Sequence, residues 1–247
     1  MTKDKIYFAS DFHLGAPNMA ESHKREKKIV QWLTEIEKDA KAIYLVGDIF
    51  DFWFEYNKVV PKGFVRLLGK IANLTDKGTQ VHLFSGNHDL WMKGYLESEI
   101  GAIIHHGNII IQEGEKKILI GHGDGLGNGD NLYKILKKIF TSKICKWMFA
   151  RLHPNFAFTL AHTWSNNSRK GGDKAKFISK EKEILFGYCQ EQQKINPVDY
   201  YVFGHRHLPL KIKIDKKATY INLGEWISQK NYGVLEKGII KLETYRQ

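Results

Sequence analysis

The stretch AIYLVGDIFDFW, residues 42–53, decides the fold. It begins with an apolar run that is typical of a short buried strand, and this run ends at Gly47. Asp48 and Asp51 follow directly. In open α/β sheets, ligands bind in the crevice at the carboxyl ends of the strands. An acidic pair in this position therefore predicts either a helix cap or part of a ligand site.

The rest of the chain repeats this alternation of strands and polar loops. Helix-like segments at 21–38 and 62–77 separate the first strands, and hairpin-like patterns follow from residue 102. Further strands are predicted at 5–10, 81–85, 103–112, 116–121, 198–204, 209–215, 218–223 and 232–245. The pattern predicts an α/β protein in which a mixed sheet, or two packed sheets, is flanked by helices.

Five strands are followed by side chains that commonly bind metal ions. These are Asp11 and His13, Asp48 and Asp51, Asn87 with His88 and Asp89, His122 and Asp124, and His205 and His207. Alone, each group has an ordinary explanation, such as a turn or a helix cap. If each group had only its ordinary explanation, their occurrence after five separate strands would be five independent coincidences. Together they predict a metal site.

The number and type of these donors predict two divalent ions. Carboxylate, imidazole and amide donors without a thiolate suit Mn²⁺, Fe²⁺ or Zn²⁺ and do not select among them. Our expectation is Mn²⁺. Hydrolytic sites with two metals hold their ions about 3.5–4 Å apart. One aspartate that bridges both ions would produce such a site.

The motifs DFH, GDIFD, GNHD, GH and GHRH, in this order, resemble the calcineurin-like metallophosphoesterase superfamily over about residues 6–207. The resemblance implies a sandwich of mixed β-sheets flanked by helices, and phosphoester hydrolysis. It assigns Asp11, His13, Asp48 and His207 to one ion. It assigns Asp48, Asn87, His122 and His205 to the other, with Asp48 as the bridge. His88 would be the catalytic histidine, Asp89 its orienting partner, and Asp51 would support the ligands.

A mostly helical insertion at about 130–192 interrupts the strand pattern, and we expect one domain, 1–247, with this insertion as a cap. Residues 131–176 contain eight Lys and two Arg but one acid, a net charge of +9 out of the chain's +11. The segment 131–149 also has a broad apolar face at helical spacing. This can be a plain amphipathic helix, or a surface for nucleic acid, an anionic membrane or a phosphorylated ligand. Apolar and aromatic residues continue through 151–164, which favours an amphiphile.

GDIFDFW, GHGDGLGNGDNLYK and NNSRK resemble the bacterial UDP-2,3-diacylglucosamine hydrolases of lipid A synthesis, which carry a helical cap after the HGD segment. The resemblance implies cleavage of the pyrophosphate bond of UDP-2,3-diacylglucosamine to UMP and 2,3-diacylglucosamine 1-phosphate. The substrate contacts that it implies are Asn87, His88, Asp130, Tyr133, Asn167, Ser168, Arg169, Lys174 and His205. One difference is that His88 stands where the well-studied hydrolases have arginine. A histidine can donate a proton, whereas arginine only holds charge.

Two alternatives remain open from the sequence. The chain can be another calcineurin-like phosphodiesterase or phosphatase that acts on a different nucleotide, nucleic acid or lipid phosphoester. It can also be a metal-dependent scaffold, although a scaffold has no need of His88. Nucleic acid is disfavoured because the basic residues accompany apolar ones, and no obligate protein partner is evident. The charged N-terminus and the two distant cysteines predict a cytoplasmic protein. The basic and apolar cap adds the expectation of peripheral association with the inner membrane at its cytoplasmic face.

Overall fold

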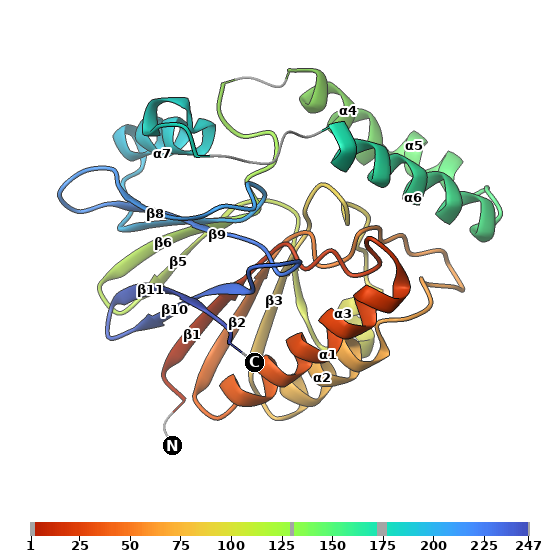
Figure 1. The fold of residues 1–247 in the computed structure, drawn as a ribbon, viewed down its shortest axis with the longest axis horizontal. Helices are drawn as coiled ribbons and strands as arrows, with labels where there is room; N and C mark the ends of the chain where they lie inside the picture. The colour runs from red at the N-terminus through yellow and green to blue at the C-terminus, as the bar shows by residue number, and fades with distance from the viewer. Residues whose placement is uncertain (1–2, 129–130, 172–176, 247) are drawn as a thin grey trace.

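Two mixed β-sheets form the body of the protein (Figure 1). We describe them in a computed structural model that covers residues 3–128, 131–171 and 177–246, without the side chains of residues 162, 164 and 166–171. The first sheet has the order β11-β10-β1-β2-β3-β4. Its strands are β1 (Lys5–Ala9), β2 (Ala40–Val46), β3 (Gln80–Phe84), β4 (Ile103–His105), β10 (Asn231–Glu236) and β11 (Ile239–Thr244). Strands β1 to β4 are parallel, and β10 and β11 are antiparallel additions at one edge.

The second sheet has the order β5-β6-β7-β9-β8. Its strands are β5 (Ile109–Glu113), β6 (Lys116–Gly121), β7 (Tyr200–Phe203), β8 (Pro209–Lys213) and β9 (Thr219–Leu223). The three central strands are parallel, and antiparallel strands form both edges. Two packed mixed sheets flanked by helices confirm the predicted fold class.

Alternation along the strands supplies two separate cores, because successive side chains of a strand point to opposite faces. Phe8 and Tyr44 face the second sheet and pack in a cluster with Val202. The intervening Tyr7 and Ile43 face outward and pack with helices in another cluster. The helices on that face are α1 (Met19–Ile36), α2 (Val65–Asp76) and α3 (Tyr95–Ile100). The predicted helices at 21–38 and 62–77 therefore correspond to α1 and α2.

The predicted strand 103–112 is two strands in different sheets. Its first part, β4, pairs with β3, and its second part, β5, pairs with β6. Residues 106–108 carry the chain from one sheet to the other. The prediction of a single strand was wrong because both halves have a similar apolar pattern, which does not indicate the sheet to which each half belongs.

The segment predicted as a cap contains two structural units. Helices α4 (Asn131–Thr141), α5 (Lys143–Phe149) and α6 (Pro154–Gly171) gather above the body, and we call these three helices the lid (Figure 1). The lid rests on aromatic residues of the body: the Phe149 ring lies 4.8 Å from that of Phe54 and 4.7 Å from that of Trp91. The indole N–H of Trp91 also donates to the Phe140 carbonyl at 2.8 Å. The division of the chain into one domain with a cap remains a prediction.

Helix α7 (Ile184–Ile195) belongs by its contacts to the body and lies apart from the lid (Figure 1). Its residues Leu185, Phe186 and Cys189 are buried in a cluster with Tyr201 and Tyr220 of the second sheet. A short 3₁₀ turn, η1 (Lys180–Lys182), precedes it. None of the helices in the described part of the chain has the length and apolar composition needed to cross a membrane.

The packing of α7 makes a stability prediction. Leu185 is 2% exposed, whereas Ile195 on the same helix is 76% exposed. Leu185→Ala should lower the free energy of unfolding by about 2–5 kcal/mol, because it leaves a cavity in the body. Ile195→Ala should change it by less than about 0.5 kcal/mol. Urea unfolding of both variants measures the difference, and equal effects would contradict the placement of α7 in the body.

Candidate metal centre and substrate cavity

Loops from both sheets meet at one end of the body. They follow β1, β2 and β3 of the first sheet and β6 and β7 of the second. Backbone hydrogen bonds join them: the N–H of Asp11 donates to Gly47 at 3.0 Å, and the N–H of Gly204 donates to His122 at 3.0 Å. The position of each loop is therefore set by its neighbour as well as by its own strand.

One group of donors comprises Asp11, His13, Asp48 and His207, whose ligand atoms all lie within 4.8 Å of one another. His207 Nε2 lies 3.1 Å from Asp11 Oδ1, and His13 Nε2 lies 3.8 Å from Asp48 Oδ2. The Nε2 atoms of His13 and His207 are 3.0 Å apart. This group has the same members as the first predicted ligand set.

A second group comprises Asp48, His122 and His205. His122 Nε2 lies 3.3 Å from Asp48 Oδ2. The side-chain oxygen of Asn87 lies 3.2 Å from His122 Nε2 and 2.9 Å from His205 Nδ1, so it completes the group. Asp48 is the residue that both groups share, as a bridging carboxylate would be.

The chemistry of these groups fits divalent cations. Asp11 and Asp48 are 0% and 1% exposed, and buried carboxylates are normally paired with cations or bound to metal ions. The short distance between the Nε2 atoms of His13 and His207 brings two nitrogen lone pairs together unless one is protonated or both face an ion. His13 Nδ1 is buried and has no hydrogen-bond partner among the described residues.

The four candidate histidine ligands form two pairs: burial opposes protonation of all of them, but the charges of Asp48 and Asp11 outweigh it and raise the pKa of His122 and His207. Burial lowers the pKa of His13 to about 3 and that of His205 to about 4, so both imidazoles are neutral near pH 7. Burial alone would raise the pKa of Asp48, but the charges of His122 and His88 outweigh it and hold this pKa well below its usual range. The residue shared by the two donor groups is therefore a carboxylate anion.

The backbone at the candidate ligands is strained. Asp11, His13, Asp48, His205 and His207 have φ values of 57°, 45°, 51°, 67° and 53°, in the left-handed region. A non-glycine residue held in a sparsely populated region costs about 1–3 kcal/mol and persists where its surroundings dictate it. Strain at five of the predicted ligands indicates that the loops are shaped for the site.

Glycines next to the ligands allow the loops to approach closely. A Cβ atom at Gly86 would lie 2.2 Å from Asp48 Oδ1, and one at Gly204 would lie 2.5 Å from Asp11 Oδ2. Real Cβ atoms essentially never come so close to a neighbour. Glycine is therefore a steric requirement at both positions, directly before Asn87 and directly before His205.

His88 lies beside the shared carboxylate. The backbone N–H of His88 donates to Asp48 Oδ1 at 2.9 Å. The ring Nδ1 lies 3.2 Å from the Asp51 carbonyl and 3.1 Å from the Ser165 hydroxyl. The Nε2 atom makes no hydrogen bond to any described residue, and His88 faces a cavity. Ser165 lies on the lid, and the sequence analysis did not identify it.

Asp89 contacts backbone groups instead of the His88 ring. Its carboxylate accepts hydrogen bonds from the N–H groups of Gly86, Ile49 and Phe50 at 2.7, 2.8 and 3.2 Å. Within the described residues, the ring of His88 is bound to Asp51 and Ser165. The contacts of Asp89 therefore hold the loops after β2 and β3 together. No contact between Asp89 and the His88 ring supports the predicted role of Asp89 in orienting that ring.

Arg206, between the two histidine ligands of the last loop, is a further residue that the sequence analysis did not identify. Its guanidinium binds both oxygens of Glu183, with Nε 3.0 Å from Oε1 and a terminal nitrogen 3.3 Å from Oε2. Glu183 is 3% exposed and directly precedes α7. This two-point ion pair anchors the loop that carries His205 and His207 to the helix.

The predicted substrate contacts in the lid are described only in part. The hydroxyl of Tyr133 donates to Asp124 Oδ2 at 2.5 Å, and Lys137 Nζ lies 2.6 Å from the same oxygen. Asp124 thus joins α4 to the loop after β6. Asp130 and Lys174 lie outside the described residues, as do the side chains of Asn167, Ser168 and Arg169 on α6.

A cavity of about 430 Å³ lies between the lid and the donor groups. Asp51, Asn87 and His88 line it on the side of the donors. Its remaining lining is mostly apolar and includes Phe52, Leu90, Trp91, Leu136, Phe140, Phe149, Leu160 and Ala161. The cavity therefore joins a polar, metal-binding end to a hydrophobic end.

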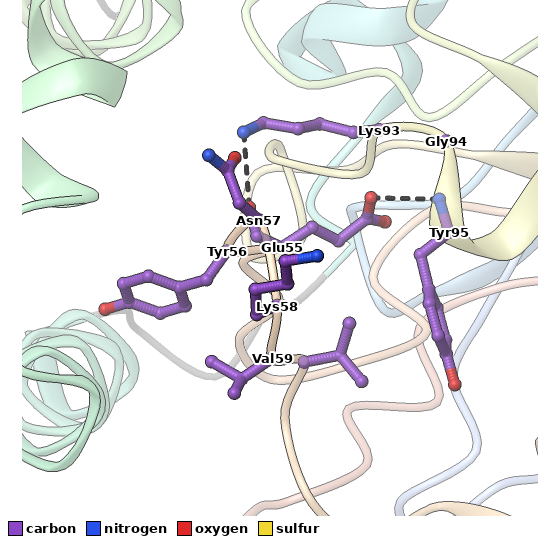
Figure 2. Close-up of a pocket in the computed structure, with 9 residues that line it drawn as sticks. Glu55, Tyr56, Asn57, Lys58, Val59, Lys93, Gly94 and Tyr95 are labelled. Atoms are coloured by element: carbon purple, nitrogen blue, oxygen red, sulfur yellow. Dashed lines mark hydrogen bonds between the residues drawn. The ribbon is translucent and has the colours of Figure 1, made fainter.

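A second hollow, of about 490 Å³, is lined by residues 55–60 and 93–95 (Figure 2). The Glu55 carboxylate inside it accepts hydrogen bonds from the Tyr95 N–H at 3.1 Å and the Trp53 indole at 3.0 Å. Lys93 Nζ donates to the Glu55 carbonyl at 3.2 Å (Figure 2). These groups are partnered by one another, and none of the predicted site residues lines this hollow.

Comparison with known proteins agrees with this geometry. Residues 4–209 match the family model described as Calcineurin-like phosphoesterase. A Porphyromonas gingivalis protein named UDP-2,3-diacylglucosamine hydrolase is 36% identical over 98% of this chain and 98% of its own length. Proteins of the same name are 26% identical in Pseudomonas putida, over 90% of both chains, and 26% identical in Haemophilus influenzae, over 94% of this chain and 93% of that one.

The shared carboxylate generates a prediction about metal content. Asp48→Ala should lower the bound metal of both ions, since both donor groups lose a ligand. His207→Ala should lower mainly one, because His207 belongs to a single group. Elemental analysis of the dialysed proteins measures both effects. Two full equivalents of metal in Asp48→Ala would refute the bridging assignment.

Proposed function

Because the chain belongs to the calcineurin-like phosphoesterase family, we propose that it hydrolyses the pyrophosphate bond of UDP-2,3-diacylglucosamine. Water is consumed, and the products are UMP and 2,3-diacylglucosamine 1-phosphate. The relatives that carry this name are similar to the chain over at least 90% of its length. The single observation on which the substrate class rests is the cavity that joins the donor groups to an apolar lid.

The two donor groups would hold two divalent ions, with Mn²⁺ proposed before Fe²⁺ or Zn²⁺. When bound, such ions polarise a phosphoryl group and stabilise the charge that develops as its bond to oxygen breaks. Asp48 would keep both ions at one phosphoryl group. His88 Nε2, which has no protein partner in the described structure, would donate a proton or a hydrogen bond to the leaving phosphate.

The cavity has the polarity that an amphiphilic substrate requires. The phosphates would lie at the end lined by Asn87 and His88, and the acyl chains would lie among Phe140, Phe149 and Leu160. Each buried methylene contributes about 0.8 kcal/mol of hydrophobic free energy. Acyl chains can therefore supply much of the binding energy, while the polar end fixes which bond is cleaved.

The outer surface of the lid supports a second proposal, reversible attachment to an anionic membrane at the cytoplasmic face. Leu132, Ile144 and Trp147 are 71%, 73% and 60% exposed. Lys138 and Lys143 are exposed on the same two helices. Exposed apolar residues with interspersed lysines are typical of segments that lie in the membrane interface. A lid at the membrane would receive its acylated substrate directly from the bilayer.

The first experiment compares UDP-2,3-diacylglucosamine with deacylated UDP-glucosamine as substrates of the metal-loaded protein. We expect the acylated compound to be hydrolysed with a much higher kcat/KM, and UMP to be the nucleotide product. Ala161→Phe, which narrows the apolar end, should lower kcat/KM for the acylated compound and spare a small soluble phosphodiester. Equal kcat/KM values for the two UDP-sugars in the wild type would favour a generic phosphodiesterase.

The second experiment tests His88. His88→Ala should lower turnover about 10²–10⁴-fold if the ring acts as a general acid. Its metal content should persist, because His88 belongs to neither of the two proposed ligand sets. Turnover close to that of the wild type would remove His88 from the mechanism.

The third experiment tests the lid surface with anionic vesicles. Each basic residue near an anionic leaflet contributes about 1 kcal/mol, so Lys138→Glu with Lys143→Glu should weaken vesicle binding by more than about tenfold. Reversal of Lys213 and Lys216, which are exposed near the β8–β9 hairpin, is the matched control and should leave binding almost unchanged. Equal losses in both variants would indicate nonspecific attraction by net charge.

A further inference from the structure

The lid contributes one hydroxyl group directly to the predicted catalytic residue. Ser165 is on α6, is 4% exposed, and places its Oγ 3.1 Å from Nδ1 of His88. The two residues are separated by 77 positions in the sequence, so the contact exists only while the lid is docked on the body. Both side chains line the cavity proposed for the substrate.

The second contact of the same nitrogen determines its protonation. His88 Nδ1 also lies 3.2 Å from the Asp51 carbonyl oxygen, which can only accept a hydrogen bond. The proton of a neutral His88 is therefore on Nδ1, shared between this carbonyl and the Ser165 hydroxyl. Nε2 then has no hydrogen-bond partner among the described residues and is available to a substrate in the cavity that His88 lines.

We infer that Ser165 is a positioning residue that makes the orientation of the His88 ring depend on docking of the lid. The inference rests on the proposed function, because Ser165 would act by positioning His88, the residue to which the proposed function assigns a catalytic role. The Asp51 carbonyl holds the ring from the body, and Ser165 holds it from the lid. With the lid displaced, only the first of these contacts remains.

Contacts other than that of Ser165 also hold the lid on the body, and they make its role separable by mutation. Phe149 packs against Phe54 and Trp91, and Lys137 is paired with Asp124. These contacts would keep the lid in place when the hydroxyl is removed. A loss of activity in Ser165→Ala would then report the His88 contact rather than loss of the lid.

The test uses Ser165→Ala, the conservative Ser165→Thr, and Thr163→Ala as the matched control. Thr163 is exposed on the same helix, and its hydroxyl donates to the Thr159 carbonyl at 2.8 Å. Ser165→Ala should lower kcat about threefold to tenfold, the effect of one ordinary hydrogen bond, with little change in KM. Ser165→Thr should recover most of the loss, and Thr163→Ala should match the wild type.

A double-mutant cycle with His88→Ala distinguishes positioning from an independent role. If Ser165 acts through His88, Ser165→Ala should have no further effect in the His88→Ala protein. The same factor lost in both backgrounds, or a rise in KM alone, would overturn the inference. The cycle is measured with bis(p-nitrophenyl) phosphate as well as UDP-2,3-diacylglucosamine. A lack of turnover of the UDP-sugar alone would therefore contradict the proposed function and leave the Ser165 test intact.

A spectroscopic measurement gives an answer that does not depend on turnover. The ¹⁵N chemical shifts of the His88 ring report which nitrogen carries the proton. The wild type should show the proton on Nδ1, and Ser165→Ala should show a shifted Nδ1 resonance, because this nitrogen loses one of its two hydrogen-bond partners. An unchanged His88 spectrum in Ser165→Ala would contradict the inference.

Discussion

The carboxylate of Asp48 is the constraint on which the rest of the site depends. It is 1% exposed, lies 3.8 Å from His13 and 3.3 Å from His122, and accepts the N–H of His88. These partners come from three different loops and from both sheets. A buried anion among so many histidines is costly unless cations accompany it. The packing of the two sheets, which brings these loops to one end of the body, can therefore be understood as a means of building one charge-balanced centre.

Local strain at this centre is balanced by the regular structure around it. The candidate ligands with left-handed backbone follow strands that are buried and paired on both sides, such as β1, β2 and β7. The two-point pair of Arg206 with Glu183 and the three backbone hydrogen bonds of Asp89 hold the intervening loops. Rigid strands and anchored loops give ligand positions that a flexible loop would lose. The lid is attached through aromatic contacts of Phe149 and through polar contacts of Trp91 and Asp124 with α4.

The sequence indicated which side chains gather at the candidate centre because each predicted ligand follows a short apolar strand. Strand ends in a parallel sheet lie at one edge, so local pattern and topology together bring Asp11, Asp48 and Asn87 close. Contacts that depend on packing between distant elements could not be predicted in this way. Ser165 is one small polar residue in a helix, and nothing local indicates that it reaches His88. For the same reason, periodicity did not separate β4 from β5 or assign α7 to the second sheet.

The central claim is that one carboxylate bridges two metal ions at this centre. Electron paramagnetic resonance of the protein loaded with Mn²⁺ tests it most directly, because two ions about 3.5–4 Å apart that share a carboxylate have magnetically coupled spins. The account predicts the spectrum of a coupled Mn²⁺ pair in the wild type and its loss in Asp48→Ala. A spectrum of isolated Mn²⁺ ions at full occupancy of the wild type would contradict it.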